Sequence, residues 1–140
     1  MMESLPVLVD SNILLDVLTE DRTWFAWSSE KLAECAETND LCINPIIYSE
    51  VSIGFKKIEE LEEVLPKDYF KYLHLPYEAA FLAGKCFLKY RKARGNKRSP
   101  LPDFFIGAHA AVNGMTLLTR DMGRYHTYFP GLQIICPGTS

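Results

Sequence analysis

Short apolar runs alternate along the chain with longer segments in which apolar side chains recur every three or four residues. The short runs suit strands that are buried on both faces, and the longer segments have the spacing of amphipathic helices. This alternation predicts an α/β fold in which helices cover both faces of a central, mostly parallel sheet of four to five strands. The expected strands cover residues 5–9, 40–44, 70–75, 115–119 and 132–136.

Capping residues and chain breakers delimit the helices expected between these strands. Ser11 and Asn12 supply oxygens that suit a helix start, and Gly114 stands where a helix would end. The predicted helices cover residues 13–18, 23–36, 46–58, 77–94 and 104–112, with a further boundary at Pro66. No internal repeat or low-complexity segment interrupts the pattern, so residues 1–140 are interpreted as one domain.

Composition narrows the class of protein. The chain has 140 residues, of which 48% are apolar and 24% charged, as in an ordinary globular domain. A net charge of -3 gives no overall attraction to nucleic acid, so any such binding depends on a local basic patch. The four cysteines form no CxxC pair, which argues against a zinc site or a disulfide framework. No apolar run is long enough for a membrane span or signal peptide, and a cytoplasmic setting is expected.

Four acidic residues stand where apolar segments end, whereas the other acids lie in polar runs. An acid buried alone in such surroundings is costly unless it is paired or bound to a metal. In parallel sheets, sites form beyond the carboxyl ends of the strands, so these side chains are expected to converge. They are Asp10 after VLV, Glu50 in the helix after CINP, Asp103 at the start of FFIGAHAAV, and Asp121 after LLT.

Each acid also has a plainer interpretation. Asp103 and Asp121, taken singly, fit helix N-caps equally well, and Glu50 alone would be a surface residue. Asp10 is harder to explain in this way, because Ser11 and Asn12 can cap the following helix without it. The combination of all four favours one shared acidic site.

The motifs around these acids resemble a known family. The segments VDSNILLDVL, YSEV, LPDFFIGAHA and LLTRDMGRYHTYFPGLQII are similar to the successive motifs of PIN domains, specifically of VapC-like toxins from toxin–antitoxin pairs. The resemblance covers nearly the whole chain in the expected order. The residues from Glu59 to Leu75 carry no motif of the family.

The resemblance implies a fold, an activity and partners. It implies a PIN-like domain that cleaves RNA internally with Mg²⁺ or Mn²⁺, held inactive by a separately encoded antitoxin and working as a homodimer. By the same resemblance Asp10, Glu50, Asp103 and Asp121 are the metal-binding catalytic acids. Asn12 and Thr119 match polar positions that support them. Hard divalent cations prefer oxygen ligands, so four carboxylates are a suitable donor set.

Positive charge for an RNA substrate is concentrated in one run, Lys89 to Arg98, directly before Asp103. This run suits phosphate contacts, and it equally suits a solvated helix end whose cations favour the helix dipole. The candidate substrate-binding residues are Arg94, Lys97, Arg98, Arg120 and Arg124. His109, six residues after Asp103, is turned about 240° around an ideal helix and is expected in the core or an interface.

Three other functions remain open at this point. A PIN-like scaffold that binds RNA or protein without cutting fits the motifs, although the intact set of acids argues against it. A structure-specific DNA nuclease is a further alternative. A phosphoacceptor receiver domain also places acids at strand ends, but the arginine and aspartate that follow Thr119 fit it poorly.

Overall fold

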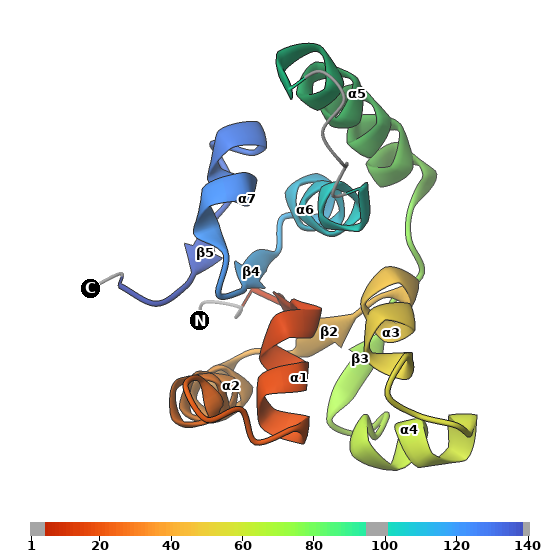
Figure 1. Cartoon of the computed structure of the whole chain (residues 1–140), viewed down its shortest axis with the longest axis vertical. Coiled ribbons are helices and arrows are strands. Elements are labelled where there is room, and N and C mark those ends of the chain that lie inside the picture. The colour runs from red at the N-terminus through yellow and green to blue at the C-terminus, as the bar shows by residue number, and fades with distance from the viewer. Residues whose placement is uncertain (1–4, 95–100, 139–140) are drawn as a thin grey trace.

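In the computed structural model the chain forms a five-stranded parallel sheet with helices on both faces, as the hydrophobic pattern predicts. The structure describes residues 5–94 and 101–138. In chain order the elements are β1 (Val7–Val9), α1 (Ser11–Leu18), α2 (Phe25–Thr38), β2 (Leu41–Ile43), α3 (Pro45–Ser52), α4 (Ile58–Val64), β3 (Phe70–Tyr72), α5 (Tyr77–Arg94), α6 (Leu101–Asn113), β4 (Thr116–Leu118), α7 (Met122–Tyr128) and β5 (Ile134–Ile135). Figure 1 shows how these elements are arranged.

The strand order is β3-β2-β1-β4-β5, and every neighbouring pair is parallel. Strand β1 therefore lies at the centre, with Leu8 paired to Cys42 on one side and to Leu117 on the other. The chain continues outward from β1 to β2 and β3, then returns across the sheet to β4. The connections thus diverge at the carboxyl ends of β1 and β4, where ligand sites form in parallel sheets of this kind.

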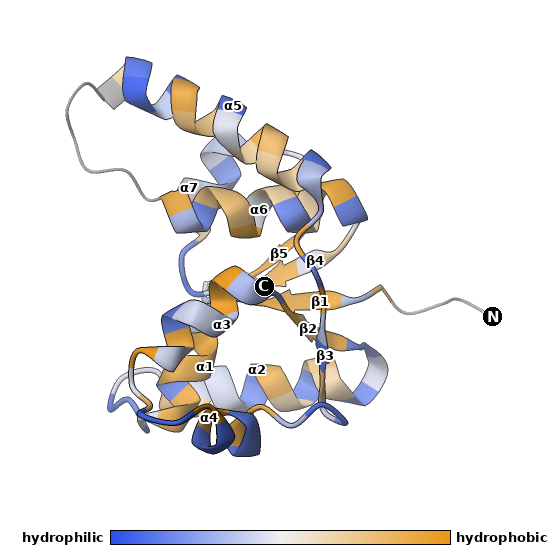
Figure 2. Ribbon diagram, turned by 90° about the vertical axis from the view of Figure 1, so that its right-hand side faces the viewer, coloured by the Kyte–Doolittle hydropathy of each residue, from blue (hydrophilic) through white to orange (hydrophobic). Residues whose placement is uncertain are grey.

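Two layers of helices enclose the sheet. Figure 2 shows α5, α6 and α7 above the strands and α1, α2 and α4 below them, with the strands forming an apolar band between the layers. Helix α3 contacts both α1 and α6. All residues of β1 and β2 are buried, which explains why these strands appear in the sequence as unbroken apolar runs.

Several boundaries differ from those expected, most clearly around α3, α4 and α6. The helix predicted for residues 46–58 ends at Ser52, whose hydroxyl donates to the Ser49 carbonyl, a side-chain bond that competes with the helix. A separate helix, α4, begins after Lys57, whose backbone N–H donates to the Glu60 carboxylate at 3.3 Å. Helix α6 begins at Leu101 rather than residue 104, since a proline fits the first turn of a helix.

The end of α6 agrees with the sequence. Gly114 follows the helix with φ of 65°, a left-handed conformation that glycine adopts without strain. Helix α7 was not expected, because its seven residues are too few and too polar to give a clear helical pattern. Among the described residues, no helix combines the length and apolar character needed to cross a bilayer.

Candidate functional site

Asp10 follows the central strand directly, and the residue is only 2% exposed. One carboxylate oxygen, Oδ1, accepts a 2.7 Å hydrogen bond from the backbone N–H of Ser11. Asp10 is thus itself the N-cap of α1, and the expectation that Ser11 and Asn12 would do this in its place is wrong. The reason is local, since the extended backbone of Asp10 directs its side chain back over the first turn of the helix.

The other oxygen of Asp10, Oδ2, accepts hydrogen bonds from two hydroxyl groups. The Thr119 hydroxyl donates at 2.7 Å and the Tyr125 hydroxyl at 3.0 Å. Burial nevertheless raises the pKa of Asp10 to about 6, because the hydrogen bonds and the cap only partly compensate for lost water, and the charge of Asp103 adds to the rise. The carboxylate is therefore held in a site that penalises its negative charge.

Thr119 connects this aspartate to its neighbours. While its hydroxyl donates to Asp10, it accepts from the Asn12 side-chain amide at 3.2 Å and from the backbone N–H of Asp121 at 3.1 Å. A hydroxyl group can donate one hydrogen bond and accept two, so the Thr119 hydroxyl makes all the hydrogen bonds that it can. The Asn12 carbonyl in turn accepts from the backbone N–H of Arg120 at 3.2 Å. Asn12 and Thr119 thus support the junction that holds Asp10 and the start of α7.

Glu50 and Asp103 reach the same region from α3 and α6. The Ser11 hydroxyl donates to Glu50 at 2.7 Å, which joins α3 to the start of α1. The pKa of Glu50 is raised by its partial burial and by the charge of Asp103, against the effect of the Ser11 hydrogen bond. The carboxylate of Asp103 lies 3.3 Å from the Tyr125 hydroxyl. The charge of Asp103 thus acts on both Asp10 and Glu50, so these three acids share one site.

Asp121 takes a different position. It is exposed and stands at the N-cap of α7, although its side chain makes no capping hydrogen bond. Its connection to Asp10 runs through the Thr119 hydroxyl. The structure therefore brings Asp10, Glu50 and Asp103 together and places Asp121 at their edge.

Of the candidate phosphate-binding residues, only Arg120 has a described side chain. Its guanidinium donates two hydrogen bonds to Asp16, at 2.6 and 3.0 Å, and lies 5.1 Å from the centre of the Trp24 ring. These contacts give Arg120 a structural partner and lend no support to a phosphate-binding role. Lys97 and Arg98 lie outside the described residues, as do the side chains of Arg94 and Arg124.

Two contributors to this region were not recognised in the sequence. Tyr125 contacts two of the acids with its hydroxyl, and Asp16 accepts from the guanidinium of Arg120. His109 is buried, as expected, with Nδ1 3.0 Å from the side-chain amide of Asn44, and burial lowers its pKa. His109 is a core residue.

The donor set suits a hard divalent cation by its chemistry. The three acids present carboxylate oxygens, and the charge of Asp103 adds to the raised pKa of both Asp10 and Glu50, a repulsion that a bound cation relieves. Within the described part of the chain, however, no three histidine, cysteine or acidic side chains already stand as a ready-made group of metal ligands. The acids fit a cation in type, but their side chains must adjust to hold one.

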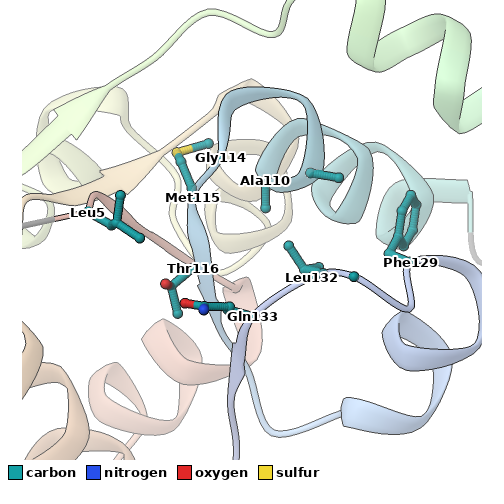
Figure 3. A pocket seen from close by; sticks show the side chains of 10 residues that line it. Leu5, Ala110, Gly114, Met115, Thr116, Phe129, Leu132 and Gln133 are labelled. Carbon is teal, nitrogen blue, oxygen red and sulfur yellow. The ribbon is translucent and has the colours of Figure 1, made fainter.

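An apolar cavity of about 350 Å³ lies at the opposite edge of the sheet. Figure 3 shows three of the residues that line it. Thr116 begins β4, Gln133 directly precedes β5, and Leu5 lies ahead of β1. These residues stand at the amino ends of parallel strands, whereas the acids stand at the carboxyl ends. The cavity is therefore separate from the acidic site.

Comparisons with known proteins agree with this geometry. The family model described as "PIN domain" matches residues 7–129, so the chain belongs to the PIN domain family, a family of nucleases. The comparison with curated proteins found no match.

Solved structures of similar fold come from toxin–antitoxin complexes. VapBC2 from Rickettsia felis, bound to a DNA fragment from its promoter, gives a TM-score of 0.68 at 18% identity, over 94% of this chain and 98% of that chain. DNA-bound VapBC from Salmonella typhimurium gives 0.67 at 20%, over 94% and 98%. A toxin–antitoxin complex from Klebsiella pneumoniae gives 0.65 at 23%, over 94% and 97%. At these identities the likeness establishes the fold: a single PIN-like α/β domain.

Proposed function

We propose that this chain is a metal-dependent endoribonuclease and the toxin of a VapBC-type toxin–antitoxin pair. The observation that carries the proposal is the convergence of Asp10, Glu50 and Asp103 beyond the carboxyl end of the central strand, where the charge of Asp103 acts on the other two. Membership of a nuclease family supports hydrolysis of a phosphodiester bond. The similar VapBC structures support the toxin role.

Each residue has a task that follows from its contacts. Asp10, Glu50 and Asp103 would hold Mg²⁺ or Mn²⁺, and Asp121 at the edge would complete the set of oxygens. The bound cation would supply charge relief at the phosphate and activation of a water molecule. Thr119 and Ser11 orient the carboxylates of Asp10 and Glu50 with 2.7 Å hydrogen bonds. Such fixed orientation lowers the cost of assembling the site for each substrate.

An RNA cleavage assay tests the activity. Single-stranded and structured RNA would be incubated with the purified chain in Mg²⁺, in Mn²⁺ and in EDTA. Wild-type protein is expected to cut with either metal and to stop in EDTA, and Asp103→Asn is expected to lose cleavage. Asp40→Asn, which changes an exposed acid paired with Lys71, is the matched control and should cut normally. Full cleavage by Asp103→Asn, or in EDTA, would contradict the proposal.

The proposed partners are a cognate antitoxin and a second copy of the chain, in the cytoplasm. The VapBC complexes of similar fold support the antitoxin. A face of α5 supports self-association, since Tyr77 and Phe81 are four residues apart and 92% and 69% exposed. Light scattering should show a dimer, and Phe81→Glu should shift it towards monomer, whereas a monomeric wild type would remove the dimer from the proposal. Co-expression with the protein encoded beside this chain tests the antitoxin by inhibition of cleavage.

A further inference from the structure

The Tyr125 hydroxyl stands between two of the proposed metal-binding acids. It lies 3.0 Å from Oδ2 of Asp10 and 3.3 Å from Oδ1 of Asp103. A phenol has a single proton, so it donates to one carboxylate at a time, and the shorter distance favours Asp10. The two acids therefore meet through a neutral protein group that occupies the space between their oxygens.

Packing of the ring does not require this hydroxyl. The ring of Tyr125 is buried against α6, where a Cβ atom added at Gly107 would lie 3.0 Å from its Cδ1 atom. A phenylalanine ring would fill the same space and make the same contacts. The hydrogen bonds recorded for the hydroxyl go only to Asp10 and Asp103, so among the described residues its task is confined to the acids.

The hydrogen bonds of Asp10 leave little room for a cation. A carboxylate oxygen has two lone-pair positions, and Oδ2 accepts from the hydroxyl groups of Thr119 and Tyr125, with the Asn12 side-chain amide as a more distant donor at 3.4 Å. The other oxygen, Oδ1, is engaged by the backbone N–H of Ser11. Among the donors to Oδ2, Tyr125 is the one that also faces Asp103, so a cation shared by the two acids through Oδ2 would take its place.

We infer that Tyr125 is a built-in competitor of the divalent cation: its hydroxyl bridges Asp10 and Asp103 in the metal-free protein and must be displaced from Oδ2 when the cation binds. This inference rests on the metal site of the proposed function. It makes Tyr125 a positioning residue that sets the metal concentration at which the site fills.

The substitution Tyr125→Phe removes the competing hydroxyl and keeps the ring. A hydrogen bond to a carboxylate has a net strength that corresponds to about tenfold in a dissociation constant, so Tyr125→Phe is expected to bind Mn²⁺ about tenfold more tightly. In EDTA the same variant is expected to melt below wild type, because the hydroxyl group that stands between the two acids is then lost. Added metal should therefore raise its melting temperature more than that of wild type.

Titration calorimetry with MnCl₂, together with melting curves in EDTA, MgCl₂ and MnCl₂, measures both effects without any substrate. Tyr128→Phe is the matched control, since Tyr128 lies on the same helix and packs on Phe104 and Tyr90. It should bind Mn²⁺ as wild type does. Equal or weaker binding by Tyr125→Phe, with normal binding by wild type, would overturn this inference and leave the proposed function standing. No metal response in any of the proteins would overturn both.

Discussion

The buried ion pair between Asp16 and Arg120 gives the sharpest test of how this fold is held together. Asp16 is 3% exposed, and its carboxylate accepts hydrogen bonds from the Arg120 Nε at 2.6 Å, from a terminal guanidinium nitrogen at 3.0 Å and from Ser28 at 2.6 Å. These bonds join α1, α2 and the loop after β4. The substitution Asp16→Asn keeps the size of the side chain but removes its charge and replaces one of its two accepting oxygens by an NH2 group.

The magnitude follows from the burial of the two partners. Removing one member of a fully buried ion pair costs about 3–5 kcal/mol, because the remaining charge is left without compensation. The Arg120 side chain is 28% exposed, so water relieves part of that cost, and we expect a loss of about 2–3 kcal/mol in the free energy of unfolding. For a chain of this length this corresponds to a fall of about 10 °C in melting temperature.

Urea denaturation of Asp16→Asn, Arg120→Gln and the double variant measures the pair directly. The two single changes should not add, since either one alone already breaks the pair, and the coupling energy should exceed about 1 kcal/mol. Asp40→Asn is the control, because the Asp40–Lys71 pair is exposed on both sides and its loss should leave stability unchanged. A loss of less than about 0.5 kcal/mol for Asp16→Asn would refute the argument from burial.

Two further predictions concern the pH dependence of stability and the packing of glycine residues. The pKa of Asp10 is raised to about 6, so the folded state binds this proton more tightly than the unfolded chain; in EDTA, stability should fall as pH rises from about 4 to about 6 and then level off. Asp10→Asn should remove up to about 3 kcal/mol of this pH dependence in urea titrations, and a profile identical to wild type would contradict the assignment. Gly107→Ala would place a Cβ atom 2.5 Å from the Phe129 ring and should lower the free energy of unfolding by about 1–3 kcal/mol. Gly84 lies on an exposed face of α5, and a Cβ atom there would have no atom within 4 Å, so Gly84→Ala should raise the free energy of unfolding by about 0.5–1 kcal/mol. Thermal melting compares the two variants, and equal changes in their melting temperatures would contradict this prediction.

The hydrophobic pattern of the sequence predicted the parallel sheet and indicated which acids stand at the ends of apolar segments. Buried parallel strands leave unbroken apolar runs, and Asp10 was recognised because it interrupts one of them. The pattern failed where elements are short. Helices α4 and α7 have seven residues each, which is two turns, and so few positions do not establish a helical period.

Contacts between residues far apart in the sequence could not be predicted, for a different reason. Asp16 and Arg120 are 104 positions apart, and periodicity reveals which face of α1 Asp16 occupies but not what it meets there. Tyr125 carries the same difficulty. Its sequence context indicates a core aromatic residue, and only the structure shows that its hydroxyl reaches Asp10 while its ring packs beside Gly107.

The position of β1 at the centre of the sheet has a consequence for how the molecule opens. The strand has only three residues, yet each is buried and the strand is paired on both sides. Amide hydrogens in such a strand exchange with solvent only when the whole domain unfolds. The acidic site is therefore attached to the most stable part of the molecule. Heat or denaturant should abolish the site together with the fold, in a single step.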